Sequence, residues 1–572
     1  MRLGVRPSLF SFLTYSLSGN LALRLYQSGL NASPIEYSKR IRKAIFASTS
    51  SSVFALGLLL LAATGAYSAP YSLLLAVGAL AAASWLIPAS LFFKPLLLIS
   101  KRRVLCEREL PFFTTYLAIA ASSGVSLQAT MDLIRHSESL PGFRQEADRV
   151  EKVRRLYAIH PYDAMVFEAR HHPSERVKDL YLSVVAAQRQ GDTVPSILRD
   201  ELMKVFSQIQ GSLRLLTDKF SVIASAEMVA FIMLPMGILT IGAVFSSIIS
   251  LSTLVLACIG FPTLSAVLLS YMVDSSIPRE LTSPVSLRAF SLSMLSFPTA
   301  ALVAFLNWRL GILVPLHYTF GFVLLLFLVS AAIHYAPARK ESNQILSALP
   351  SFTRLVAEEA KKGVSPGMSL VRFSESHSFN RHFDRFLHRI SAFLKVGAPI
   401  SVVAGSVRFP WVVRAAFELI DEAERLGAEP KSLDHLSELV SNLGQSMRAL
   451  SSQTRFFAAV SYVNTVVLTF TTVIAVDVVG RLFVGALGTS AIALPFGLSF
   501  MTLTQFELTE SIAYLSVIYD AFLLGLVGGK LSRGGSVADG LLPGAVSVAL
   551  ALLGIFAFRE LGMIRLLFGG LA

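Results

Sequence analysis

The chain has 572 residues, of which 53% are hydrophobic and 15% charged, and its formal net charge is +13. This composition is too apolar for an ordinary soluble enzyme and indicates a membrane protein. The positive charge is not accompanied by the basic-aromatic pattern of a nucleic-acid module, which argues against nucleic acid as a partner. The two cysteines, Cys106 and Cys258, lie in a polar block and in an apolar window, so they predict no disulfide framework.

Residues 1–44 form a polar N-terminal segment in which Lys and Arg far outnumber the single acidic residue, Glu36. The positive-inside rule therefore predicts a cytoplasmic N-terminus. Nine windows then have the length and composition of membrane spans. They are Val53–Ala69, Pro70–Phe93, Val229–Ile249, Leu251–Val273, Ala289–Trp308, Gly311–His334, Phe456–Val476, Ile512–Gly528 and Leu541–Phe558.

These windows divide the chain into six parts and predict an all-α, polytopic membrane protein. Residues 45–93 form a pair of spans, 220–335 hold four spans and 456–572 hold three. Between them lie two polar blocks, 94–219 and 336–455, which we expect to be helical bundles on the cytoplasmic side. Residues 482–501 are apolar but rich in Gly and Pro, which favours a surface or re-entrant segment, with a tenth span as the alternative.

The two polar blocks share a pattern of helix boundaries, 239 positions apart. The first copy runs from Pro111 to Gly124 and the second from Pro350 to Gly363. Because proline is favoured in the first turn of a helix and glycine just after its end, each copy predicts one helix between these two residues. Ser126 and Ser365 follow and can cap a second helix.

A later landmark repeats as well: a helical segment ends at Gly191 in the first block and at Gly427 in the second. The distance between the two glycines of a block is 67 residues in one copy and 64 in the other. We interpret the individual glycines and prolines as helix ends and turns in preference to contact sites.

This order of spans and repeated blocks resembles the type II secretion system F domain family, the membrane platform proteins of type IV pili and related machines. Two F domains in one nine-span chain are similar to the archaeal members, the platforms of archaella and adhesion pili. The run from Gly525 to Gly534, which includes Gly529, resembles the glycine-rich turn before the last span of that branch. The resemblance extends over nearly the whole chain from Ile45.

Sequence patterns typical of enzymes are incomplete. The segment ending in Gly529-Lys530 lacks the first glycine and the hydroxyl residue of a phosphate-binding loop, so we expect no ATP hydrolysis by this chain. Asp477 and Asp520 lie on late spans but lack the motif of an intramembrane aspartyl protease, and Glu227 is interpreted as interfacial. His377, His382 and His388 are not spaced for one helix face, so no metal or other cofactor is predicted.

The resemblance implies a platform that is not an enzyme and that couples a separate cytoplasmic secretion ATPase to the extraction of pilin or archaellin subunits from the membrane. It also implies a homodimer. The residues that we expect to bind the ATPase are exposed charges beside the repeated landmarks: Glu358, Glu359, Lys361, Lys362, Arg189 and Arg425. A secondary transporter and a membrane scaffold or receptor remain alternatives, although the repeat lies in the soluble blocks and not in the spans.

Overall fold

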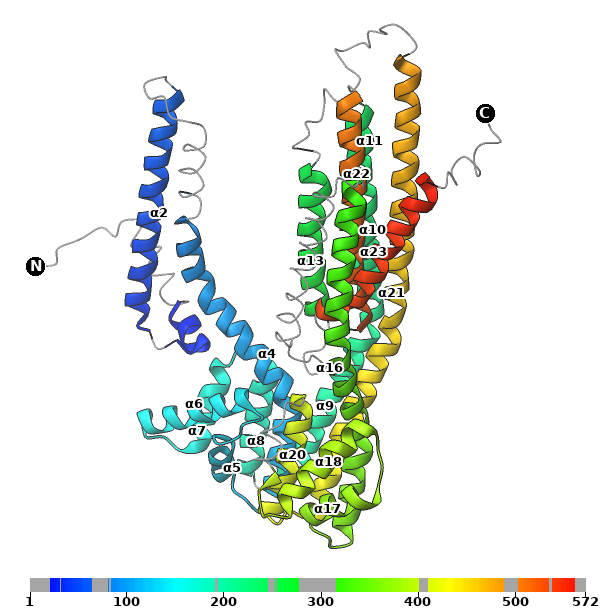
Figure 1. The fold of residues 1–572 in the computed structure, drawn as a ribbon. Coiled ribbons are helices and arrows are strands. Elements are labelled where there is room, and N and C mark those ends of the chain that lie inside the picture. Colours follow the sequence, from blue (N-terminus) through cyan, green and yellow to red (C-terminus); the bar gives the residue numbers. More distant parts are fainter. Residues whose placement is uncertain are drawn as a thin grey trace, which may run out of the picture. The chain divides into compact units, whose positions relative to one another are not determined.

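A computed structural model describes residues 21–30, 32–63, 81, 84–190, 194–244, 253, 255–276, 315–400, 410–487, 503–533 and 537–560 (Figure 1). Regular structure within these ranges is helical, and they contain no strand. The chain divides into two compact units, Met1–Leu202 and Met203–Ala572.

Unit 1 contains the first polar block and the helices that lead into it. A short helix over residues 21–28 precedes α2 (Pro34–Ala63), which packs against α4 (Leu86–Ser122). The block continues with α5 (Leu127–Ile134), α6 (Pro141–Tyr157), α7 (Pro161–His171) and α8 (Glu175–Gln190). The boundary between the units falls within α9 (Val194–Arg214).

Unit 2 contains the second polar block and the remaining apolar helices. Its first part comprises α10 (Leu216–Met228), η1 (Val229–Met233), α11 (Leu234–Val244), η2 (Leu256–Gly260) and α13 (Phe261–Ser276). The block comprises the second half of α16 (Leu316–Lys361), then α17 (Pro366–Ser376), α18 (Arg381–Leu394), α20 (Trp411–Arg425) and the first half of α21 (Pro430–Leu487). The last elements are α22 (Leu503–Arg533), η6 (Val537–Gly540), α23 (Leu541–Ile555) and η7 (Phe556–Glu560), and α21, α22, α23 and α16 pack against one another.

Six helical stretches in the described part of the chain are long and apolar enough to cross a membrane. They are Val194–Ile238, Leu256–Ser276, Leu316–Lys361, Pro430–Arg481, Phe506–Arg533 and Val537–Arg559, and each overlaps one predicted span. The predicted spans 53–69 and 70–93 lie partly outside the described residues and 289–308 lies wholly outside them, so the count of nine stays a prediction. Of the segment 482–501, residues 482–487 continue α21 and the rest lies outside the described residues.

The predicted helix starts at Pro111 and Pro350 are wrong. Both prolines lie inside longer helices, α4 and α16, which begin at Leu86 and Leu316 and continue without interruption into the blocks. A proline inside a helix removes one backbone hydrogen bond and tends to bend the helix, but packing against neighbours can offset this cost. Pro111 and Pro350 therefore lie in the interior of a long helix, and neither lies in the first turn of a helix.

The predicted glycine-rich turn is wrong at Gly525 and Gly529, while residues 534–536 lie outside the described residues. Gly525 and Gly529 lie inside α22, which ends at Arg533. A Cβ atom at Gly525 would lie 2.4 Å from the Cα of Gly544, and one at Gly529 would lie 2.4 Å from the Cα of Gly540. These glycines allow α22 to approach η6 and α23 at backbone contact, as small residues do between membrane helices.

Candidate functional site

The first block is organised around stacked aromatic rings. Phe113 of α4 is fully buried and stacks on Phe143 of α6, with ring centroids 3.7 Å apart and planes 4° from parallel. Tyr181 of α8 lies against the same ring at 6.1 Å. One aromatic side chain of α4 thus joins three helices of the block.

The second block repeats this arrangement. Phe352 of α16 lies at the position equivalent to Phe113 and is also fully buried. Its ring stacks on Phe417 of α20 at 5.3 Å and contacts Phe383 of α18 at 5.2 Å. Tyr181 and Phe417 each lie ten positions before the later glycine of their block, a signal that the sequence analysis missed. The repeat in the sequence is therefore also a repeat in the packing.

The predicted helix ends at Gly124 and Gly363 are confirmed. Gly124 has φ +74° and Gly363 has φ +85°, the left-handed conformation that closes a helix. The amide of Val125 donates to the carbonyl of Ala120, as expected for this type of helix end. The backbone of the second copy makes the equivalent bond between the residue after Gly363 and the carbonyl of Glu359.

The predicted capping serines are confirmed as well. The side chain of Ser126 accepts a hydrogen bond from the amide of Ala129, and that of Ser365 accepts one from the amide of Met368. Both blocks consequently have the same corner, where a long helix ends and a short one begins. Gly427 has φ +59° and closes α20 in the same way, whereas Gly191 lies outside the described residues.

Four helix ends of the second block meet at one place, which we call the block 2 tip. The end of α16 contacts the start of α21 through an ion pair of 2.9 Å between Lys361 and Asp434. The start of α17 contacts the end of α20, because Glu424 accepts a hydrogen bond of 2.9 Å from the amide of Gly367. The helix end with Lys361 and Lys362 and the helix end with Arg425 are thus brought together at the tip, as their positions beside repeated landmarks suggest.

Each predicted docking residue already has a local partner. Glu358 pairs with Arg354 and Arg425 with Glu422, both at 3.0 Å, while Arg189 of unit 1 pairs with Asp163. Lys362 pairs with Glu359 at 2.6 Å. Most of these pairs are on the surface, where ion pairs contribute little stability and their charges remain accessible.

The expectation that Glu359 is exposed is wrong. Its residue is only 9% exposed, and its carboxylate lies between Lys362 and Arg372. The hydrogen bond from Lys362, together with the nearby charges, holds the pKa of Glu359 below its ordinary value. Glu359 therefore orients the basic side chains around it and is not itself available to a partner protein.

Unit 1 contains a buried group of charged side chains that the sequence analysis did not predict. Arg102 of α4 donates to Glu146 of α6 at 2.7 Å, and Glu168 of α7 lies 3.5 Å from the same guanidinium. Tyr26, from the helix over residues 21–28, donates to Glu168. Arg149 donates to the carbonyl of Tyr26 at 3.2 Å. Two arginines and two glutamates thus bind the N-terminal segment to the first block.

Protonation in this group follows from burial and charge. Burial alone would raise the pKa of Glu146, but the hydrogen bond and charge of Arg102 outweigh it and lower that pKa, so Glu146 is ionised. Burial raises the pKa of Glu168, with the charge of Glu146 acting in the same direction. Burial also lowers the pKa of His172 to about 4, so this side chain is neutral near pH 7.

Cys106, Glu146 and His172 are the one group in the described part of the chain that could hold a metal ion, with candidate ligand atoms within 4.8 Å of one another. The surroundings argue against this role. Both oxygens of Glu146 accept hydrogen bonds from Arg102, whose charge repels a cation. The amide of Ser174 donates to Nδ1 of His172, which leaves the proton of the neutral ring on Nε2. We interpret the group as structural.

The three histidines singled out in the second block make separate contacts. His377 bonds to Ser376 and lies against Phe373, and His382 faces Glu341 at 3.8 Å. His388 is exposed on α18.

Several polar side chains at or near the ends of the predicted spans contact neighbouring helices of unit 2. Glu227 is fully buried and accepts a hydrogen bond from Ser461 of α21, so it contacts a second helix, and its position at the membrane interface stays a prediction. Asp477 pairs with Arg481 of its own helix, whereas Asp520 is buried. Lys530 pairs with Asp274 of α13 at 2.7 Å, so its amine connects two helices. Such contacts are typical of polar groups between membrane helices.

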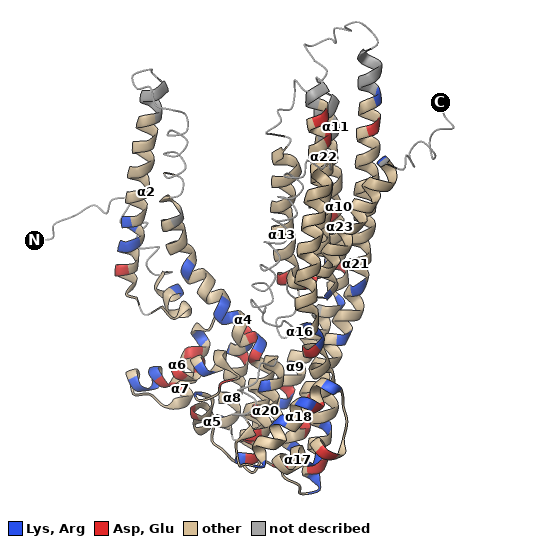
Figure 2. Cartoon of the chain, viewed as in Figure 1, with Lys and Arg blue, Asp and Glu red and all other residues tan. Residues whose placement is uncertain are grey.

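Charged residues are unevenly distributed along the helices of unit 2. Figure 2 shows that the long helices are almost free of charge over most of their length, while Lys, Arg, Asp and Glu gather on α17, α18 and α20 and near the block. A polar helical block thus continues directly into apolar helices of membrane-spanning length.

Residues 113–242 match the family model of the type II secretion system (T2SS), protein F. The chain carries a type II secretion F domain. The match begins at Phe113, the central ring of the first block, and ends in α11, so it covers the block from that ring onward and the apolar helix after it. A search of curated proteins and a search of solved structures each gave no match. The chain is thus a multi-pass membrane protein with the domain of secretion and pilus-type platforms.

Proposed function

We propose that this protein is the membrane platform of an archaeal type IV pilus-like machine, either a pilus or an archaellum. In this role a separate cytoplasmic hexameric ATPase binds the two helical blocks. Its nucleotide-driven movements pass to the spans, which help to lift pilin or archaellin subunits into the filament. The chain itself performs no chemistry, requires no cofactor and works as a homodimer.

The observation that supports mechanical coupling is the continuity of α16 and α21. Each is one uninterrupted helix, of 46 and 58 residues, which contains both an apolar span and a wall of the second block. At about 1.5 Å per residue these helices are about 70 and 87 Å long. A displacement of the block therefore moves the span, because no flexible loop separates the two.

The block 2 tip is our proposed ATPase docking site. It joins four helix ends and presents Lys361 and Lys362, whose side chains are 52% and 66% exposed. Since Lys361 pairs with the half-exposed Asp434 and the side chain of Lys362 is itself exposed, an acidic patch on a partner can compete for both amines.

The test uses two double variants. The first carries Lys361→Gln and Lys362→Gln, and the control carries Arg385→Gln and Arg389→Gln on the exposed face of α18. Glutamine is used because a glutamate at 362 would face the buried Glu359. We expect normal abundance for both variants, and about 5- to 30-fold weaker ATPase binding, sensitive to salt, for the first alone. Equal loss in both variants, or normal binding and filament numbers in the first, would exclude the tip as the docking site.

Orientation is part of the same proposal, and cysteine labelling tests it. Cys106 and Cys258 are buried, so a new exposed cysteine gives a clear signal. Single cysteines at Leu156 and Ser378, both exposed, should resist an impermeant thiol reagent in intact cells and react after lysis. Labelling from outside would place the blocks on the wrong side of the membrane for an ATPase.

Two rival functions predict different results. A secondary transporter predicts substrate-dependent flux in liposomes, and a scaffold or receptor without a role in filament assembly predicts normal filaments in cells that lack this chain. The platform predicts no flux, no ATP hydrolysis by the purified chain, and capture of a secretion ATPase on it. ATP hydrolysis in a preparation free of that ATPase would contradict the proposal.

A further inference from the structure

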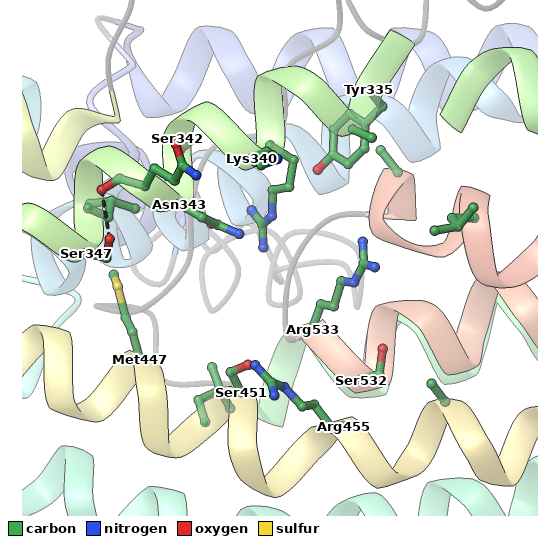
Figure 3. A pocket seen from close by; sticks show the side chains of 18 of the residues that line it. Tyr335, Lys340, Ser342, Asn343, Ser347, Met447, Ser451, Arg455, Ser532 and Arg533 are labelled. Carbon is green, nitrogen blue, oxygen red and sulfur yellow. Dashed lines mark hydrogen bonds between the residues drawn. The ribbon is translucent and has the colours of Figure 1, made fainter. Parts of the chain in front are cut away.

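A cavity of about 1010 Å³ lies in unit 2, where the long helices pass from the apolar region into the block (Figure 3). Its walls come from α16, α21, the end of α22 and the start of α23. Five of the lining residues are basic: Arg339, Lys340, Arg448, Arg455 and Arg533.

The positive charge of this cavity is not balanced locally. The lining contains no acidic residue. Arg339 faces the buried Asp539 at 3.3 Å, which neutralises one of the five charges. The other four basic residues have no ion pair with any carboxylate in the part of the chain that the structure describes. Like charges that converge on one cavity repel one another, so an anion bound among them is favoured.

Part of the cavity lining is apolar. Ala332 of α16, Ala458 of α21 and Leu542 of α23 line it, and Leu542 is 49% exposed. Tyr335 and Tyr462 lie at the same level, and tyrosine is enriched where a membrane helix meets the headgroup region. A ligand that fits both the basic and the apolar lining carries a negative head and an apolar tail.

The position of the basic residues along the helices indicates the depth of the site. Arg455 directly precedes the apolar window that begins at Phe456, and Arg339 follows the window that ends at His334. Arg533 is the last residue of α22, and Figure 3 shows its side chain extending from that helix into the cavity. The cations therefore lie at the ends of three spans, the level of lipid phosphates.

We propose that this cavity binds the headgroup of an anionic phospholipid from the leaflet next to the block. The phosphate lies among Arg455, Arg533 and Arg448, and an acyl chain extends past Leu542. The site connects the two helices, α16 and α21, that contain both span and block, so a bound lipid holds them at a fixed separation. Lipid occupancy would thus regulate how movement of the block reaches the spans.

The test uses the purified full-length chain in detergent, titrated with dioleoyl phosphatidylglycerol and followed by native mass spectrometry. Arg455→Gln with Arg533→Gln should bind this lipid about 30-fold more weakly, since each basic side chain near an anionic lipid surface contributes about fivefold in affinity. The control, Arg385→Gln with Arg389→Gln, removes the same charge from the exposed face of α18 and should bind as the wild type does. Circular dichroism confirms that both variants keep their helicity.

Several results would overturn the proposal. Equal loss in the control variant would mean a general effect of net charge. Equal affinity for dioleoyl phosphatidylcholine would remove the requirement for an anionic headgroup, and inorganic phosphate that binds as tightly as the lipid would identify a free anion site. Wild-type lipid binding in the cavity variant, combined with loss of ATPase binding, would make the cavity a protein docking site instead.

Discussion

The same substitution, glycine to alanine, should have three different outcomes at three positions of this chain. At Gly363 the backbone φ is +85°, and a Cβ atom would contact nothing within 4 Å. The entire cost is therefore conformational, about 1–2 kcal/mol for an alanine in the left-handed region. Gly124, with φ +74° and equally open space, should behave as Gly363 does.

At two other glycines the backbone conformation is ordinary, so the effect of alanine depends on helix propensity or on the space for its Cβ atom. Gly211 lies in α9 with no neighbour within 4 Å of its Cβ position, so alanine there should gain up to about 1 kcal/mol of helix propensity. At Gly528 a Cβ atom would lie 1.8 Å from Oγ of Ser461, the residue that donates to Glu227. Alanine there should displace Ser461 and leave the buried Glu227 without its hydrogen bond.

Hydrogen exchange read peptide by peptide measures these effects locally, without assuming that so large a protein unfolds in one step. A loss of 1–2 kcal/mol corresponds to about 5- to 30-fold faster exchange, because 1.4 kcal/mol is about tenfold. We expect that acceleration in block 2 peptides for Gly363→Ala, and slower or unchanged exchange around Gly211→Ala. If Gly363→Ala exchanges as the wild type does, the helix end does not depend on the left-handed glycine, and our account of the repeated corner is wrong.

Two further predictions concern the buried charges of unit 1. Arg102→Met leaves Glu146 and Glu168 buried without their cation, so hydrogen exchange in unit 1 peptides should show a loss of about 3–5 kcal/mol. Arg103→Gln breaks a half-exposed ion pair and should cost less than about 1 kcal/mol in the same peptides. Equal losses would contradict the structural role of Arg102. Burial lowers the pKa of His172 from its ordinary value of 6.5 to about 4 in the fold. As the pH falls, the imidazole of the unfolded chain is therefore protonated before that of the folded chain. About 3 kcal/mol of stability should be lost between pH 6.5 and 4. His172→Gln should remove that part of the pH dependence, and an unchanged pH profile would mean that the ring is accessible to protons in the fold.

The helix ends could be predicted from the sequence because the residues that form them are local. A left-handed glycine followed two positions later by a capping serine determines its own backbone, and both corners of this kind are present. The prolines misled the prediction for the same local reason. Pro111 and Pro350 are compatible with a first turn, and only the packing of the preceding residues extends each helix through them.

Contacts between distant residues could not be predicted in the same way. The ion pair of Arg102 with Glu146 joins positions 44 residues apart, and the bond from Tyr26 to Glu168 joins positions 142 apart. One sequence provides no signal for such pairs, because a charged residue in a polar block has the same pattern whether it is buried or exposed. The burial of Glu359 was missed for this reason, since its helix position alone did not reveal that Arg372 of α17 lies over it.

The divergence of the two blocks indicates a division of roles within the proposed platform. In the first block, buried charged side chains bind residues 21–28, so a force on this block acts on α4 and on the N-terminal segment together. The second block has no buried arginine paired with two glutamates among its described residues. Both blocks are continuous with apolar helices, the first through α4 and the stretch Val194–Ile238 and the second through α16 and α21. A repeated core with different attachments lets one ATPase surface act on two blocks while the membrane helices respond to each differently. A chain with two interchangeable blocks would lack this asymmetry: Arg102 is buried against Glu146, whereas Glu341, 239 positions after Arg102, is half-exposed and faces His382.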